Sequence, residues 1–284
     1  VMEKTELGMF LELQFKSLTP EVVKTVCDNE LYENVALVTD DTMADKLLTG
    51  HLNKIIETAV RAGMPMEKAI YCATWTPSRR MHLDDRGMIA PGKIADFMLL
   101  DSLDGIDPVV VYKKGECVYC KDEEACGAAE AAACSFPASF YHTINCRPAE
   151  ISDFVLKAED PDAKWAEVNV MKIGTFGTAT TPVKRRVEVK DGVLDWKSAG
   201  LSLAVVFERY GKNGNIGYSL VEGALTKPGA VATTWSHDSH NLFVLGTDEN
   251  DMKLAQRRVL ELQGAYVVFS EGRSLAEARL TIGG

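Results

Sequence analysis

The sequence predicts an α/β section followed by an α+β section. Near the start, a short apolar run at residues 35–38 is followed by helical periodicity over residues 44–61, as in a βα unit. Beyond residue 151, strand-like runs alternate with turns rich in Gly, Asn and Asp. The 284 residues are 46% hydrophobic, enough for one substantial core and, we expect, a second.

Charge and composition exclude several classes of partner. The chain has 31 Lys+Arg against 41 Asp+Glu, a net charge of -10, which disfavours nucleic acid and anionic membrane surfaces. No apolar window reaches the roughly 18 to 20 residues of a membrane-spanning helix. Seven cysteines are spread from Cys27 to Cys146 without the density of a disulfide scaffold. We therefore expect a soluble, cytoplasmic protein.

The first section reads as a βα unit with an additional helix. The run at 35–38 is short and β-branched enough for a buried parallel strand. Apolar residues recur at helical spacing over 44–61, and Gly63 followed by Pro65 ends that helix. A second helix is expected over 65–75, beginning at Pro65.

A small β module follows. Residues 87–93 read as a turn, residues 95–100 as a strand, and residues 109–112 and 116–119 as a hairpin. The Ala- and Cys-rich residues 121–147 have weak patterning and are the best candidate for a linker or domain boundary.

The last section has the pattern of an α+β domain. Residues 242–246, a helix closed by Gly264, and residues 266–270 form a βαβ unit that we expect to be right-handed. The remaining strand candidates are residues 166–173, 183–190, 201–208 and 230–235.

Two adjacent carboxylates end the first predicted strand. In parallel α/β sheets and barrels functional groups collect at the C-terminal ends of strands, where Asp40 or Asp41 could bind a divalent cation or accept a proton from water. The alternative is that one of them caps the following helix. Because adjacent side chains point in different directions, both interpretations can hold together.

A polar turn lies between two of the later strands. It consists of His237, Asp238, Ser239, His240 and Asn241. These groups could supply metal ligands, a proton shuttle, or hydrogen bonds to a polar planar ligand. The alternative is a hairpin turn in which Asp238 and Asn241 bond local backbone.

Other motifs are weaker. Residues 211–217 are glycine-rich, but no Gly-Lys-Ser/Thr follows, so a tight turn is favoured over a phosphate loop. Cys117 and Cys120 could suggest zinc or a redox pair, but the later cysteine spacings are irregular and incidental thiols are favoured. We place His51 inside the first helix as a structural imidazole, and His82 in a charged turn.

Six motifs stand out in chain order: residues 38–41, 47–53, 73–79, 87–96, 208–211 with 214–217, and 236–241 with 246–252. Taken together, they resemble the adenine deaminase family of the amidohydrolase superfamily. The first four are shared in looser form by many amidohydrolases, and the last two are more specific to adenine deaminases.

The resemblance implies the end of a metal-dependent-hydrolase (β/α)8 barrel over residues 1–86, a small β-sandwich module over 87–125, and an α+β C-terminal domain over 126–284. It implies hydrolytic deamination of adenine, a small-molecule purine base, to hypoxanthine and ammonia. Asp40 takes the role of metal ligand and proton acceptor, and Asp41 that of a neighbouring catalytic group. The residues of the 237–241 turn take the role of substrate contacts.

One family feature is missing. An amidohydrolase needs a His-x-His pair and further histidine ligands, and this sequence has no His-x-His. We therefore expect a C-terminal half whose N-terminal barrel half lies on the same or a companion chain. The complete enzyme is expected to be a homo-oligomer with a binuclear Mn, Fe or Zn site. The alternatives are a non-catalytic fragment or partner-binding subunit, and an amidohydrolase acting on another heterocycle.

Overall fold

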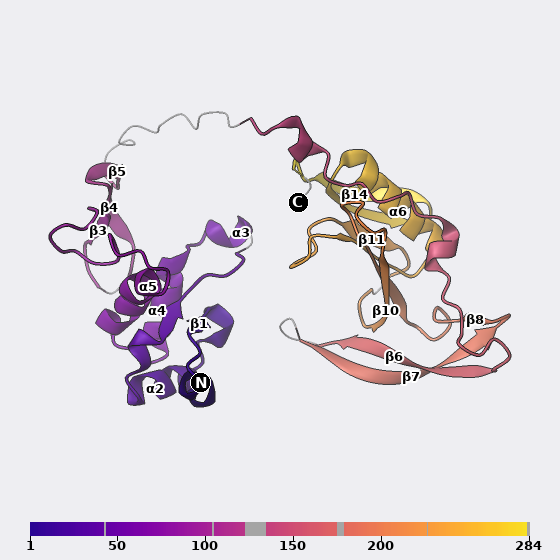
Figure 1. Ribbon diagram of the computed structural model, residues 1–284, viewed down its shortest axis with the longest axis horizontal. Helices are drawn as coiled ribbons and strands as arrows, with labels where there is room; N and C mark the ends of the chain where they lie inside the picture. Colours follow the sequence, from indigo (N-terminus) through magenta and orange to yellow (C-terminus); the bar gives the residue numbers. More distant parts are fainter. Residues whose placement is uncertain (43, 104, 123–134, 175–178, 226, 283–284) are drawn as a thin grey trace. The chain divides into compact units, whose positions relative to one another are not determined.

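The computed structural model consists of two compact units, Val1–Ala132 and Ala133–Gly284, each described by itself (Figure 1). The structure describes residues 1–42, 44–103, 105–122, 135–174, 179–225 and 227–282. The domain boundary predicted between residues 125 and 126 lies outside the described residues. Within the described helices, none is long and apolar enough to cross a membrane.

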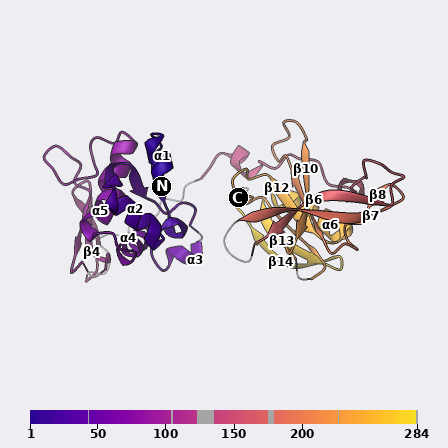
Figure 2. The same cartoon turned by 90° about the horizontal axis from the view of Figure 1, so that it is seen from below.

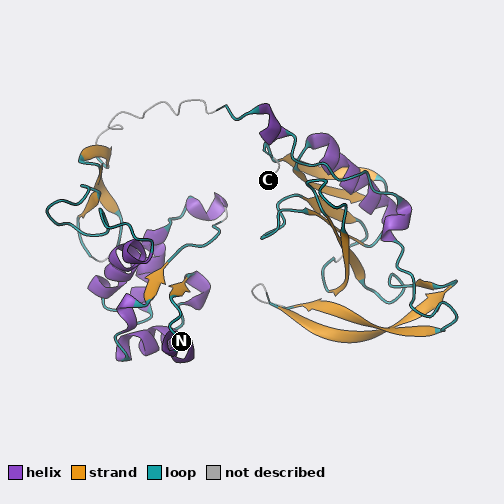
Figure 3. Ribbon diagram, in the orientation of Figure 1, coloured by secondary structure: helices purple, strands orange, loops and turns teal. Residues whose placement is uncertain are grey.

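The first unit is built on two parallel strands. β1 (Leu11–Leu13) pairs with β2 (Val35–Leu37), with Leu11 opposite Val35. The helices are α1 (Met2–Glu6), α2 (Pro20–Asp28), α3 (Ala44–Leu47), α4 (Leu52–Arg61) and α5 (Met66–Arg80), with short 3-10 turns at Phe15–Ser17 and Leu31–Glu33 (Figure 3).

The strand β2 is fully buried, as a strand of a parallel sheet covered by helices should be, whereas only the two end residues of β1 are buried. Val35 and Leu37 of β2 share a core with Ile55, Ile56 and Ala59 of α4 and Ala69 and Cys72 of α5. The β2 prediction is confirmed, whereas β1 was missed because it has three residues and its central Glu12 is exposed.

The prediction of a single helix over residues 44–61 is wrong, because the structure has two helices there. The chain leaves α3 and starts again at α4, with Gly50 at φ +137° between them. A Cβ at Gly50 would lie 2.3 Å from Cγ of Lys54, so glycine suits this bend. His51 is consequently exposed at the start of α4, not placed inside a helix.

The helix predicted over residues 65–75 is confirmed in position but runs on to Arg80. Pro77 lies inside it. The missing N–H of Pro77 leaves only the carbonyl of Ala73 without its helical donor, a loss that a helix tolerates close to its end.

The β module is a three-stranded antiparallel sheet of β3 (Phe97–Leu100), β4 (Pro108–Lys113) and β5 (Glu116–Cys120). The predicted hairpin is confirmed. Lys114 and Gly115 at its tip both have positive φ, as a tight two-residue hairpin turn requires.

The second unit contains a nine-stranded mixed sheet in the order β14-β13-β11-β12-β9-β10-β6-β7-β8. Figure 2 shows the long β6–β7 hairpin extending from the rest of this unit. The strands are β6 (Trp165–Ile173), β7 (Thr180–Lys190), β8 (Val193–Leu194), β9 (Ser202–Phe207), β10 (Ile216–Glu222), β11 (Ala230–Thr233), β12 (Leu242–Gly246), β13 (Ala265–Ser270) and β14 (Arg273–Arg279). Short 3-10 turns lie at Ala138–Tyr141 and Ile151–Phe154.

The helix α6 (Glu249–Leu262) connects β12 to β13. Both strands are antiparallel to β11, which lies between them, so they are parallel to each other and the predicted βαβ pattern is confirmed. Asp248 caps α6 by accepting the N–H groups of Asn250 and Asp251. The inner face of α6 is buried in a core that also holds Trp196 and Phe207.

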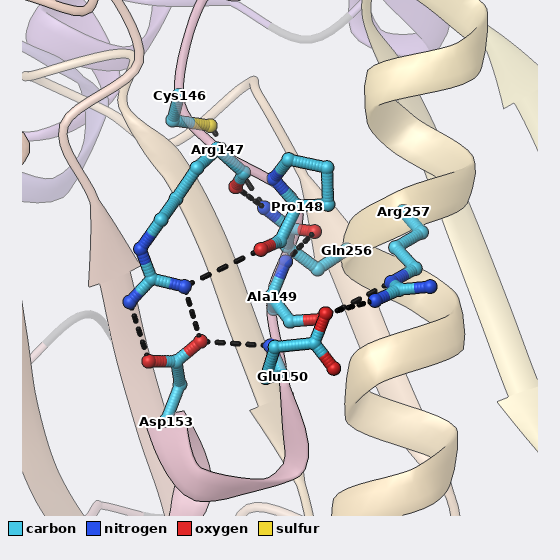
Figure 4. A network of polar contacts seen from close by, with 8 residues as sticks. All are labelled: Cys146, Arg147, Pro148, Ala149, Glu150, Asp153, Gln256 and Arg257. Carbon is cyan, nitrogen blue, oxygen red and sulfur yellow. Dashed lines mark hydrogen bonds and ion pairs between the residues drawn. The ribbon is translucent and has the colours of Figure 1, made fainter.

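A segment before the sheet is fastened to α6 by side-chain contacts (Figure 4). Arg147 donates two hydrogen bonds to the carboxylate of Asp153, at 2.7 and 2.6 Å. Gln256 of α6 donates to the carbonyl of Arg147 and accepts from the N–H of Ala149, each at 2.9 Å. Such paired amide contacts act like a short length of β-ladder. They fix the path of residues 143–149, which we call the strap.

Candidate functional site

Asp40 lies beyond the carboxyl end of β2, beside the residue that follows β1. Because the two strands are parallel, their ends meet at the same edge of the sheet. Gln14 Nε2 donates to Asp40 Oδ2 at 2.6 Å, and the N–H of Asp41 donates to Asp40 Oδ1 at 2.7 Å. The backbone of Asp40 is left-handed at φ +57°, a conformation that Asp tolerates better than most residues. The sequence and the register thus fix the position of this carboxylate.

The bonding of Asp40 leaves it able to hold a cation. A carboxylate offers about four lone-pair sites, and one protein donor occupies each of its oxygens here. Its side chain is exposed. Neither donor is an N–H of α3, so the capping alternative does not describe the bonds that Asp40 makes.

A cavity of about 460 Å³ opens at the same strand ends. Gln14, Thr39, Asp41 and Thr42 line it from the strand side, and His51 and Lys54 line it from the start of α4. The place of His51 in the cavity wall was not predicted, because an unbroken helix was expected over residues 44–61. Gly50, which lies within that range, was the signal in the sequence for a break before His51.

Lys54 contributes a fixed positive charge to the wall of the cavity. Its Nζ lies 2.7 Å from Glu57 Oε1 and 3.3 Å from Asp107 Oδ1. The hydrogen bond to Glu57 raises the pKa of Lys54, and the same bond lowers the pKa of Glu57. Lys54 therefore stays protonated and acts as a charge, not as a base.

The 237–241 turn joins β11 to β12 in the second unit. His237, Asp238 and Ser239 are exposed, and His237 Nδ1 contacts Asp238 Oδ1. Local bonds shape the turn: the N–H of His240 donates to the carbonyl of Ser236 at 2.7 Å, and that of Asn241 donates to Ser239 Oγ at 3.3 Å.

A buried arginine also holds this turn. Arg209 is 4% exposed and lies just beyond β9. Its Nη1 donates to the carbonyl of His240 at 2.8 Å, and its backbone N–H donates to Asn241 Oδ1 at 3.2 Å. Among the described residues, the side chain of Asn241 thus bonds a backbone group about 30 residues away and not the local backbone, although local bonds shape the rest of the turn. Arg209 lies in the 208–211 motif, but its role in holding the turn was not predicted, because its partners lie about 30 residues or more away in the sequence.

The glycine-rich residues 211–217 do cradle an anion, but it belongs to the chain. Glu208 accepts the N–H groups of Tyr210, Lys212, Asn213 and Gly214 at 2.8 to 3.4 Å. Desolvation opposes the charge of Glu208, but these four bonds outweigh it and lower the pKa of the carboxyl. The preference for a turn over a phosphate loop is confirmed, except that the last two residues already belong to β10.

The cysteine motif shows no metal-site geometry among the described residues. Cys117 Sγ lies 3.5 Å from the carbonyl of Tyr119. Within the described part of the chain, no group of three or more metal-ligating residues includes Cys117 or Cys120. Cys126 and Cys134 lie outside the described residues.

The predicted site residues thus fall into two sets. Asp40 and Asp41 belong to the first unit, at the edge of the cavity. The five residues of the 237–241 turn belong to the second unit. Asp40 and Asp41 contact each other, and the residues of the turn contact one another.

In the first unit an acidic residue lies beyond the carboxyl end of a buried parallel strand, where barrel hydrolases collect their functional groups. Residues 16–121 match the model of the amidohydrolase family. Residues 177–284 match the adenine deaminase C-terminal domain. The chain belongs to the adenine deaminase family of the amidohydrolases.

Curated relatives agree over the whole chain. It is 46% identical to "Adenine deaminase 2" of Oenococcus oeni over 287 aligned positions, covering 100% of this chain and 49% of that protein. It is 43% identical to "Adenine deaminase" of Clostridium perfringens and 40% identical to that of Lactobacillus delbrueckii subsp. bulgaricus, covering 50% and 49% of them. The chain therefore spans about half the length of the curated relatives it matches.

Proposed function

We propose that this chain is part of an enzyme that hydrolytically deaminates adenine to hypoxanthine and ammonia. The observation that carries the proposal is the carboxylate of Asp40, held at the carboxyl end of β2 beside a cavity, in a chain similar along its whole length to adenine deaminases. Barrel hydrolases collect their reacting groups at this end of the strands.

Asp40 fits a divalent metal as one ligand of a larger set. It offers hard carboxylate oxygens with lone pairs to spare, and imidazole with carboxylate suits Mn, Fe or Zn. One carboxylate does not complete such a site, and no His-x-His occurs in the sequence. The remaining ligands of the proposed binuclear site belong to an N-terminal barrel half, on the same or a companion polypeptide.

The proposed roles follow from chemistry. The metal, when bound, lowers the pKa of water toward neutrality. Asp40 holds the metal and accepts a proton, which it passes toward the leaving amine. Asp41, on the wall of the cavity, acts beside it. Gln14, by donating to Asp40 Oδ2, fixes the carboxylate in one orientation.

The 237–241 turn is proposed to contact the purine. His237, Asp238, Ser239, His240 and Asn241 together offer donors and acceptors suited to the ring nitrogens of a planar base. In this proposal residues 1–86 end the barrel, residues 87–125 belong to the β-sandwich module, and residues 126–284 form the C-terminal domain. The complete enzyme is a cytoplasmic homo-oligomer.

A substrate panel tests the proposal. The full-length polypeptide carrying this chain is supplied with Mn²⁺, Fe²⁺ or Zn²⁺, and ammonia release or ring opening is measured with adenine, guanine, cytosine and a dihydropyrimidine. Release of ammonia from adenine, with hypoxanthine as the product, is expected. Turnover of another compound in preference to adenine would refute the substrate assignment.

A further inference from the structure

We propose that Arg209 is a positioning residue that holds the 237–241 turn in its substrate-binding conformation and fastens it to the strap. The inference rests on the proposed function, because it assumes that the turn contacts the purine. It adds a residue that touches no substrate and acts through His240 and Asn241.

Arg209 joins three segments that are far apart in the sequence. Its guanidinium Nη1 donates to the carbonyl of His240 at 2.8 Å, and Nη2 donates to Oγ1 of Thr143, the first residue of the strap, at 2.9 Å. Its backbone carbonyl accepts the N–H of Asn145 at 2.5 Å, while its own N–H donates to Asn241 at 3.2 Å. A change of path in the strap would therefore be transmitted to the turn through one residue, by its backbone and its side chain.

The planar fork of the guanidinium is what makes this connection possible. Two of its nitrogens point at two acceptors on different segments, and the side chain is 4% exposed. A lysine ammonium is a point charge on a flexible stem, so it cannot hold two acceptors in the same fixed arrangement. The contact thus selects arginine by geometry as well as by charge.

The conformation of His240 needs such support. Its backbone lies in the left-handed region at φ +49°, which costs free energy for a residue with a Cβ. Bonds at its N–H, to Ser236, and at its carbonyl, from Arg209, impose this conformation from both sides. Without the second bond the residue is free to relax to negative φ, which would turn its imidazole away.

The imidazole has a defined orientation as a result. Its Nδ1 is buried and has no hydrogen-bond partner among the described residues, and the same holds for Oγ1 of Thr234, which is 0% exposed, in the same connection between strands. Because Nδ1 is buried, the proposal assigns the contact with a ligand to Nε2, the other ring nitrogen. The loss of Arg209 should therefore weaken the binding of the base more than it slows the chemical step.

The test uses four variants of the metal-loaded full-length enzyme with adenine. Arg209→Lys keeps the charge but not the fork, and Thr143→Val removes only the strap acceptor. Arg258→Lys is the matched control, because the guanidinium of Arg258 also holds two acceptors of the same unit, Glu277 and Glu261, neither of which belongs to the strap or the turn. His240→Ala reports separately whether the turn binds substrate. The melting temperature and the values of KM and kcat are measured for each.

We expect Arg209→Lys to raise KM about tenfold or more with a smaller change in kcat, and Thr143→Val to raise it by less. Arg258→Lys should leave KM unchanged, whatever its effect on the melting temperature. A raised KM in His240→Ala with a parental KM in Arg209→Lys overturns the inference and leaves the proposed function standing. Parental kinetics in His240→Ala overturns the substrate role of the turn, and the inference with it. An equal rise of KM in Arg258→Lys shows general destabilisation and also overturns the inference.

Discussion

The contact between Gln14 and Asp40 gives a quantitative test of how the site is held together. Gln14→Leu keeps the side-chain volume but removes the donor that lies 2.6 Å from Asp40 Oδ2. A hydrogen bond to a charged group contributes about 1.5 to 3 kcal/mol, and because Asp40 is exposed the lower end applies. Since about 1.4 kcal/mol corresponds to a factor of ten, Gln14→Leu should lose at least about tenfold in metal affinity and in kcat/KM.

The same estimate follows from metal sites in general, in which removal of a group that orients a ligand costs about 10- to 100-fold in metal affinity or activity. The assay is a competition titration of the divalent metal against a chelator, together with kcat/KM for adenine, in the full-length enzyme. Glu12→Gln is the control, because Glu12 is exposed on β1, two residues before Gln14. Metal affinity and kcat/KM in Gln14→Leu equal to those of the control would refute the reasoning.

Three further expectations concern the stability and reactivity of the chain. The hydrogen-bonded ion pair with Arg147 lowers the pKa of the Asp153 carboxyl. Ionised Asp153 therefore stabilises the fold above the unfolded pKa of about 3.9, and this stability is lost as the pH falls through the lower pKa of the folded state. Asp153→Asn should flatten the acid limb of the unfolding free energy, and an unchanged limb contradicts the assignment. Burial raises the pKa of Cys72 to about 12, so peptide mass spectrometry after native alkylation at pH 8 should find this thiol unmodified; rapid labelling would show that its core opens. Gly229 has φ +145°, and Gly229→Ala would place a Cβ 2.5 Å from the carbonyl oxygen of Phe269, which should lower the free energy of unfolding in a urea titration by at least about 1 to 3 kcal/mol. Gly217→Ala is the control, because a Cβ there meets open space. Equal losses of stability in the two variants would count against the strain at Gly229.

Several elements could be predicted because their signals are local. The apolar run that forms β2, the two-residue turn of the β4–β5 hairpin and the helical spacing of α6 each lie within a few residues of sequence. Asp40 could be predicted as a site residue for the same reason, since it lies three residues beyond the end of β2. Its position at a strand end followed from the general architecture of parallel sheets.

The features that escaped prediction depend on tertiary contacts. β1 has three residues with an exposed centre, and only its pairing with β2 makes it a strand. The break at Gly50 overrides an apolar periodicity that continues across it, which is why His51 was misplaced. The contacts of Arg209, a residue of the 208–211 motif, were not predicted because its partners lie in two segments distant in sequence. Periodicity cannot register contacts of this kind.

The most direct test of the central claim compares the full-length enzyme with its Asp40→Asn variant, measuring bound divalent metal by elemental analysis and ammonia released from adenine. The parent should bind metal and release ammonia. Asp40→Asn should bind less metal and lose at least about a hundredfold in kcat, the lower range for loss of a general acid–base group. A variant that keeps the metal content and turnover of its parent, or a metal-loaded parent that leaves adenine unchanged, would contradict the account.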